Sequence, residues 1–276
     1  MVDRSRLVGR THRSDTITID PDHAEAFSAV VGHEPRSHRG RPVVSPFYAA
    51  FVVAPLWRRI YQAPELGTRD QLVLHAEQRM LWHRHLYAGQ RVWATLLVSD
   101  VVGFGFNDAA IIRCRLREDD GTLLSTMEST LTIRGDSGFS PRSTRTANPR
   151  RVGTAASATH TFDTDAPQRY ADVADDHNPL HLDDEAAREA GHPGRILHGM
   201  CTLATGVTAL AGRLSDGRPR RLGFVRTRFA RPVLPGSTLD LTAHTTTAAG
   251  VYALTATLGG RAVLKNTLMG LAKEEQ

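Results

Sequence analysis

The pattern of apolar and polar positions divides the chain into helical and β-like segments. Apolar residues recur at helical spacing after Pro21, and "SPFYAAFVVAPLWRRIY" from Ser45 predicts a buried helix with a break near Pro55. Between Gln71 and Arg134 the chain instead shows short β-like runs, which predict strands. Asp120-Gly121 separates two of these runs and predicts a tight hairpin turn.

The same order of elements recurs in the second half. A strand is predicted near "ATHTFD", helices over residues 168–189, an apolar helix from Gly199 and strands from there to the end. When the stretch that begins at Trp82 is laid over the one that begins at Phe229, three residues match in kind: Trp82 with Phe229, Arg84 with Arg231, and Gly89 with Gly236. Two copies of a helix-then-sheet unit predict two related α+β domains packed as an internal pseudo-dimer.

A segment without periodicity separates the two copies. Residues 134–157 are rich in Ser, Thr, Arg, Pro and Gly, a composition typical of a linker. We therefore expect an N-terminal domain over residues 1–134, a linker over 135–157 and a C-terminal domain over 158–276.

The second copy contains "DDHNPLH", a concentration of polar groups that begins at Asp175. Asn178-Pro179 predicts an exit from the preceding helix, because proline disfavours helical geometry in the residue before it. Asp183 or Asp184 can then cap another short helix. The loop would hold the carboxyl group of Asp176 and the imidazole of His181 near one point.

The next helix is predicted to begin at Gly199, within "HGM". Apolar residues at helical spacing follow and would bury one face. Free N–H groups and the helix dipole at this end favour an oxygen that gains negative charge. The combination predicts an acid–base pair beside an oxyanion site.

These residues resemble a known signature. Asp-x-Asn-Pro-Leu-His from Asp176, followed by His-Gly-Met, resembles the motif of the MaoC-like (R)-specific enoyl-thioester hydratases and 3-hydroxyacyl-thioester dehydratases. "FARPVLPG" from Phe229 resembles the same family, and the resemblance covers about Ala158 to Leu271. It implies a double hotdog fold, in which two antiparallel sheets are each wrapped around a central helix.

The resemblance also implies roles for individual residues. Asp176 and His181 take the catalytic positions, and Gly199 takes that of the backbone donor to the thioester carbonyl. Asn178 and His198 are assigned to substrate binding, Asn178 as a supporting amide; His198 has the alternative of simply packing against the loop.

The first half departs from this signature. It offers His33 and His38 but no Asp-x-Asn-Pro, and "SPF" from Ser45 stands where "HGM" would be. We therefore expect a degenerate hotdog domain without a second site, which in comparable proteins makes room for the acyl chain.

The implied activity is reversible dehydration of (R)-3-hydroxyacyl thioesters carried on coenzyme A or on the phosphopantetheine of an acyl carrier protein. No metal or redox cofactor is expected. Two alternatives stay open: a hotdog thioesterase or double-bond isomerase at the same site, and a non-catalytic subunit that binds acyl thioesters. Chain length, carrier, physiological direction and the division of protons between Asp176 and His181 are not fixed by the sequence, and homodimerisation is expected by analogy.

Composition narrows the class of protein. With 41% hydrophobic and 23% charged residues the chain is typical of globular proteins, and no apolar run long enough to span a membrane occurs. The first residues lack the apolar core of a secretory signal, and Cys114 and Cys201 have no metal-type spacing, which favours the cytoplasm. The net charge of +5 comes almost entirely from arginine, which suits phosphate or carboxylate partners or a solvated surface, but no basic block with aromatics indicates nucleic-acid binding.

Other patterns have plainer explanations. His83 and His85, with His75 nearby, lack a third metal ligand in register, so ordinary strand histidines are favoured. "GFGF" from Gly103 lacks the rest of a dinucleotide fingerprint. The linker arginines, among them Arg142 and Arg150, suit a solvated loop or a coenzyme A phosphate.

Overall fold

The computed structural model describes residues 2–67, 73–104, 107–133, 148–214 and 220–273. The elements of the first half are α1 Arg4–Leu7, β1 Thr11–Arg13, β2 Ile17–Thr18, α2 Pro21–Val30, β3 Arg36–His38, β4 Arg41–Val44, α3 Tyr48–Tyr61, a 3-10 turn at Pro64–Leu66, β5 Val73–Trp82, β6 Leu86–Tyr87, β7 Arg91–Phe104, β8 Asn107–Glu118 and β9 Leu123–Ile133. Those of the second half are β10 Arg151–Thr161, α4 Ala166–Ala174, α5 Pro179–Leu182, α6 Asp184–Glu189, α7 Gly199–Leu214, β11 Arg220–Phe229, β12 Thr238–Thr246, β13 Val251–Leu258 and β14 Arg261–Lys273.

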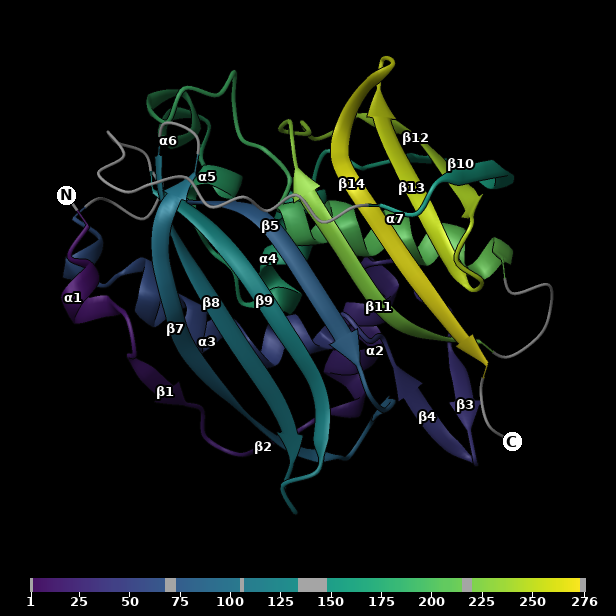
Figure 1. Ribbon diagram of the computed structural model, residues 1–276, viewed down its shortest axis with the longest axis horizontal. Helices are drawn as coiled ribbons and strands as arrows, with labels where there is room; N and C mark the ends of the chain where they lie inside the picture. The colour runs from purple at the N-terminus through teal and green to yellow at the C-terminus, as the bar shows by residue number, and fades with distance from the viewer. Residues whose placement is uncertain (1, 68–72, 105–106, 134–147, 215–219, 274–276) are drawn as a thin grey trace.

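One antiparallel sheet runs through both halves. Its strand order is β1-β7-β8-β9-β5-β11-β14-β13-β12-β10, and the pair β5–β11 joins the two halves edge to edge. Figure 1 shows the helices α3 and α7 behind this sheet, one behind each half. The architecture is the predicted α+β double hotdog, with the two expected sheets fused into one.

The register at the junction confirms the internal repeat. The matched pairs Trp82/Phe229 and Gly89/Gly236 each lie 147 residues apart, and both glycines have positive φ, 76° and 78°. At the same offset Arg79 corresponds to Arg226, and these two residues face each other across β5 and β11. A residue that pairs with its own counterpart lies on a two-fold axis, so a pseudo-two-fold axis passes through this junction.

Helix α3 is continuous, and the predicted break near Pro55 is wrong. Pro55 lies inside Tyr48–Tyr61 and deprives the helix of one backbone hydrogen bond. Residues on both sides of it, among them Val53 and Leu56, are buried in the core. Packing of a nearly all-round apolar helix outweighs the local cost of the proline.

The predicted linker is shorter than expected at its C-terminal end. Strand β10 begins at Arg151 and pairs with β12 over its length, so residues 151–157 form an edge strand. Most of their side chains are exposed on both faces of the strand. The sequence of this segment therefore lacks the alternation of apolar and polar residues that identifies a half-buried strand. Residues 135–147, including Arg142, lie outside the described part of the chain, and the domain division stays a prediction.

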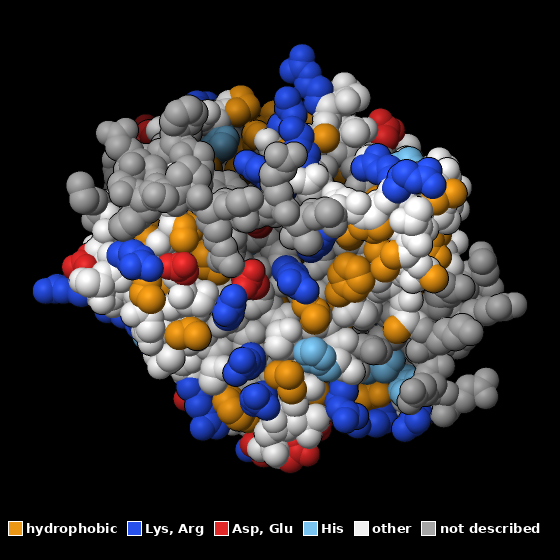
Figure 2. Space-filling view, viewed as in Figure 1, with side chains coloured by type: hydrophobic (Ala, Val, Ile, Leu, Met, Phe, Trp, Pro, Cys, Tyr) orange, Lys and Arg blue, Asp and Glu red, His pale blue; other side chains and the backbone are white. Residues whose placement is uncertain are grey.

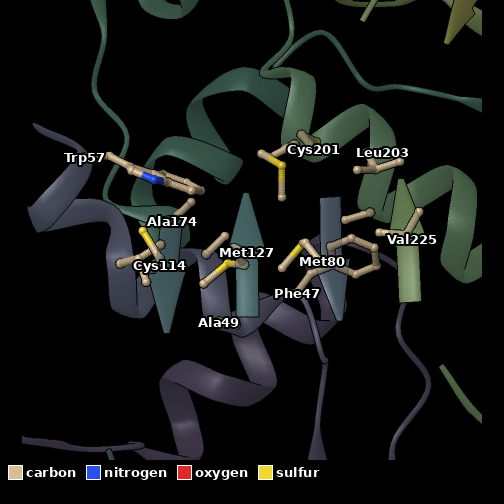
Figure 3. Packing of buried hydrophobic residues seen from close by; sticks show 14 of the residues in the cluster. Phe47, Ala49, Trp57, Met80, Cys114, Met127, Ala174, Cys201, Leu203 and Val225 are labelled. Atoms are coloured by element: carbon tan, nitrogen blue, oxygen red, sulfur yellow. The ribbon is translucent and has the colours of Figure 1, made fainter. Parts of the chain in front are cut away.

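The two halves share one core. The main cluster of buried residues includes Phe47, which precedes α3, Trp57 from α3, Met80 from β5 and Leu203 from α7. Figure 3 shows these side chains between the helices and the sheet, with Val225 of β11 close to Met80. Both cysteines are buried and unpaired, and burial raises the pKa of each thiol to about 12.

In the described part of the chain no helix is long and apolar enough to cross a membrane.

Candidate active site

The "DDHNPLH" loop connects α4 to α5, and the chain leaves the preceding helix earlier than predicted: Pro179 begins α5 instead of ending α4. Helix α4 ends at Ala174, and Asp175 adopts the left-handed conformation with φ 52°. Asn178 then caps α5, because its Oδ1 accepts a hydrogen bond from Leu180 N at 3.0 Å. The predicted supporting amide therefore shapes the loop between the acid and the imidazole, while its contact with substrate stays a prediction.

One hydrogen bond determines the tautomer of His181. Its Nδ1 lies 2.9 Å from the carbonyl oxygen of Ile196. A carbonyl can only accept, so Nδ1 carries the proton and, in the neutral ring, Nε2 carries the lone pair. His181 is therefore prepared to accept a proton at Nε2.

His198 holds the loop through a hydrogen bond to its backbone. It is 1% exposed, and its Nε2 donates to the backbone carbonyl of Asp176 at 2.9 Å. Its ring lies 3.8 Å from that of His181 and 4.9 Å from that of Tyr170, measured between centroids. The structure thus shows the packing role of His198; its assignment to substrate binding stays a prediction. Tyr170, with 2% exposure, belongs to the core as expected.

The three groups differ in protonation. Burial lowers the pKa of His198 to about 3, with the neighbouring His181 ring acting in the same direction. Burial also lowers the pKa of His181, and this effect outweighs that of the Asp176 carboxylate, which acts to raise the pKa. Burial acts to raise the pKa of Asp176, but attraction to the two imidazoles and the Asn178 N–H outweigh it, so the pKa is lowered. At neutral pH the site holds a carboxylate beside two neutral imidazoles.

Gly199 begins α7 beside the aromatic ring of Phe229. A Cβ atom at Gly199 would lie 3.1 Å from two ring carbons of Phe229, closer than side chains normally pack. The glycine thus lets the first turn of the helix approach β11. The N–H groups at this end have no partner within the helix and are available as donors to a bound oxygen.

Two cavities meet at the loop. The larger, of 450 Å³, is lined by Asp176, His181 and Gly199 together, so the structure brings the three predicted catalytic positions into one space. The smaller, of 260 Å³, lies between α3 and α4 and is mostly apolar. Five residues border both cavities: Trp57, Tyr61, Asp176, Asn178 and Met200.

His75 is a site residue that sequence reasoning missed. It lies on β5 in the first half, lines the larger cavity, and packs against Phe229 with ring centroids 5.0 Å apart. Its Nε2 donates to Oε1 of Gln78 at 2.9 Å, and burial lowers its pKa to about 4. By contrast, His85 packs on His38, away from this cavity. Nothing in the local sequence distinguished His75 from its neighbours, because only the β5–β11 pairing brings it to the site.

The segment before α3 lacks a counterpart of the predicted oxyanion donor. When "SPF" is compared with "HGM", Pro46 is opposite Gly199; it precedes α3 by two residues, and proline has no N–H to donate. Its carbonyl accepts a hydrogen bond from the indole of Trp82 at 2.8 Å. His38 is bonded instead to the hydroxyl of Tyr87, at 2.8 Å.

The described residues contain one group of three side chains that could serve as metal ligands. Asp176, His181 and His198 each offer one atom, and these atoms lie within 4.8 Å of one another. An arrangement of this kind can hold an ion or a water molecule, and both imidazoles already donate one ring N–H to a backbone carbonyl. The expectation of a metal-free site therefore stays a prediction.

The family model described as "MaoC like domain" matches residues 144–258, which include the whole loop and Gly199. The chain is 32% identical over 185 residues to 3-hydroxyacyl-thioester dehydratase Y of Mycobacterium tuberculosis, covering 64% of each protein. It is 30% identical over 222 residues to the peroxisomal enoyl-CoA hydratase 2 of Arabidopsis thaliana, covering 71% of this chain and 67% of that protein. The chain thus spans about two thirds of the length of these relatives.

Solved structures agree in fold. A MaoC-like dehydratase from Phytophthora capsici superposes with a TM-score of 0.80 at 17% identity, over 99% of both chains. A Mycobacterium tuberculosis protein described as having a double hotdog fold superposes with a TM-score of 0.65 at 16% identity, over 96% of both chains. The loop, the cavity and these similarities together show that the chain belongs to the MaoC-like dehydratase family.

Proposed function

We propose that this protein interconverts (R)-3-hydroxyacyl and trans-2-enoyl thioesters by adding or removing water. The observation that supports the proposal is the pairing of an ionised Asp176 with a neutral His181 whose Nε2 is free to accept. Both groups line a cavity that Gly199 also borders. The names of the two relatives, a 3-hydroxyacyl-thioester dehydratase and an enoyl-CoA hydratase, point to the same reaction.

Hydration would proceed through an enolate. Asp176 accepts a hydrogen bond from water and orients it, while His181 Nε2 takes its other proton as the oxygen bonds to C3. The electron pair of the double bond moves to the thioester oxygen, where the N–H of Gly199 stabilises the developing charge. The imidazolium then returns its proton to C2, and dehydration follows the same steps in reverse.

The two cavities suit the two ends of the substrate. Arg228 and Arg231 border the larger cavity, and guanidinium groups bind phosphate well, so we assign this cavity to the phosphopantetheine arm of the carrier. The smaller, apolar cavity between α3 and α4 would receive the acyl chain. Elsewhere Lys and Arg side chains are distributed across the outer face of the sheet (Figure 2), a face that a negatively charged acyl carrier protein could also approach.

We also propose a cytoplasmic location and a homodimeric assembly. The two buried free thiols suit the reducing cytoplasm. Homodimerisation is proposed on family resemblance alone, and the mechanism above uses neither a metal ion nor a redox cofactor.

Ultraviolet absorbance of the conjugated thioester tests the function directly. Native protein with crotonyl-coenzyme A is expected to consume the absorbance, and chiral analysis is expected to find (R)-3-hydroxybutyryl-coenzyme A. Asp176→Asn and His181→Ala should each lower kcat by about 10²–10⁴-fold, the usual contribution of a general acid or base. His38→Ala, in the degenerate half, serves as the control and should retain turnover.

Other outcomes distinguish the alternatives. Release of free thiol would identify a thioesterase, and migration of the double bond without hydration would identify an isomerase. Tight acyl-thioester binding without turnover, unchanged in Asp176→Asn, would identify a binding subunit.

A further inference from the structure

The backbone immediately before Asp176 is held in an unusual conformation. Asp175, at the C-terminal cap of α4, has φ 52°, and within the described chain only Arg39 and Asn266 share positive φ among non-glycine residues. L-residues adopt this conformation rarely, although Asp tolerates it better than most. The direction in which Asp176 leaves α4 depends on this single residue.

A side chain from the other half of the molecule grips that residue. Nη2 of Arg58, on α3, donates to the carbonyl oxygen of Asp175 at 2.6 Å and lies 2.7 Å from its carboxylate Oδ2. The guanidinium therefore contacts both the backbone and the side chain of Asp175. Helix α3 is itself anchored by buried residues such as Trp57, so it offers a rigid base for this contact.

Two consecutive carbonyl groups of the loop thus each accept a hydrogen bond from a different side chain. Arg58 binds the carbonyl of Asp175, and His198 binds that of Asp176. The first donor belongs to the N-terminal half and the second to the C-terminal half. Such a pair of contacts fixes the two peptide planes that flank the Cα atom of Asp176, and with them the Cα–Cβ direction of this residue.

We propose that Arg58 is a positioning residue: it clamps Asp175 so that the carboxylate of Asp176 faces His181. The inference rests on the proposed hydratase function for its kinetic consequence, but not for the clamp itself. It gives the degenerate half a part in catalysis besides lining the acyl cavity.

Arg58→Met tests the proposal, because methionine keeps an aliphatic stem beside the smaller cavity and removes the guanidinium. Arg113→Met is the matched control: Arg113 forms an ion pair with Glu128 at 2.8 Å, of similar exposure, on strands away from the loop. We expect kcat of Arg58→Met to fall about tenfold with KM within twofold, because misplacement of a reacting group by a fraction of an ångström affects the transition state most. Arg113→Met should keep both constants.

Hydrogen exchange measures the clamp without reference to turnover. The amides of Asp176 and Asn178 are bonded to Ala171 O and Asp176 Oδ1, and they should exchange faster in Arg58→Met but not in Arg113→Met. Asp175→Asn keeps a residue that tolerates positive φ and removes the charge, so it should reproduce part of the effect. The double variant Arg58→Met/Asp175→Asn should be no slower than Arg58→Met.

Unchanged exchange in Arg58→Met would overturn the proposal, as would unchanged kcat in a protein whose native form is active. If the native protein hydrates no thioester, the proposed function fails, and faster exchange in Arg58→Met alone still establishes the clamp.

Discussion

At the scale of single residues, burial sets the protonation of the histidines around the loop. His198 cannot gain a proton without placing an unsolvated charge beside His181, and its pKa falls to about 3. Burial lowers the pKa of His75 to about 4 in the same way. The carboxylate of Asp176 is therefore the permanent charge among these groups at neutral pH.

The depressed pKa of His198 predicts a loss of stability in acid. Below pH 6.5 the unfolded chain binds a proton at this residue, while the folded protein does not until about pH 3, so protonation favours unfolding. His198→Gln removes this difference while keeping a donor for the Asp176 carbonyl. Between pH 4 and 6 the free energy of unfolding should vary with pH less steeply in the variant, by about 1.4 kcal/mol per pH unit.

Urea unfolding at a series of pH values measures both slopes, and the slope rather than the absolute stability is the result that matters. Equal slopes in the two proteins would mean that folded His198 is protonated in this range.

At the scale of elements, the start of α7 distinguishes the half that holds the candidate site from the other half. Gly199 allows the helix to meet Phe229 and leaves a backbone donor in the cavity. Pro46, which precedes α3 by two residues, offers no donor and is tied to Trp82 through its carbonyl. At the positions compared, the first half therefore offers no backbone donor like that of Gly199.

Gly199→Ala should therefore separate stability from catalysis. The added Cβ would lie 3.1 Å from the ring of Phe229, so the helix start or the ring must shift by a few tenths of an ångström. Alanine is favoured over glycine in helices by about 1 kcal/mol, which offsets much of this strain. We expect Tm to change little and kcat to fall about tenfold or more, as the donor leaves its place.

Thermal melting and steady-state kinetics on one preparation check this prediction. Unaltered kcat would show that the ring yields and that Phe229 does not define the position of the donor.

At the scale of the whole molecule, the pairing of β5 with β11 joins the two repeated halves into one continuous sheet. It carries the pseudo-two-fold axis, continues the sheet and brings His75 to the site of the other half. Met80, fully buried on β5, pairs with Val225 on β11, next to the central Arg79–Arg226 pair of this junction. The halves should therefore unfold together.

Met80→Ala should lower the free energy of unfolding by about 2–5 kcal/mol, the usual cost of such a truncation in a core. Leu239→Ala, on β12 in the other half, is the comparison. Both variants should show one calorimetric transition, shifted to lower temperature. Two separate transitions, with only the first-half transition displaced by Met80→Ala, would contradict a common core.

The sequence by itself determined the features that depend on neighbouring residues. A carboxylate, that of Asp183, caps α6, and Gly199 begins α7, because these are properties of short segments. The proline after Asn178 marked a helix boundary, but as the first residue of α5 and not as the end of α4. The internal repeat could also be predicted from the sequence, since the same order of elements and three matched residue types recur in the two halves. These features predicted two related α+β domains and an acid–base pair beside a helix start, and the resemblance of the motif to the MaoC-like family implied the double hotdog fold and the roles of Asp176, His181 and Gly199.

Only the tertiary structure decided what depends on contacts between distant segments. Periodicity reports whether one face of an element is buried, but not which partner covers it, so the fusion at β5–β11 and the roles of His75 and Arg58 could not be read from the sequence. The continuous α3 and the exposed edge strand β10 have the same origin. Packing outweighed a proline in the first, and pairing with β12 formed a strand from polar residues in the second.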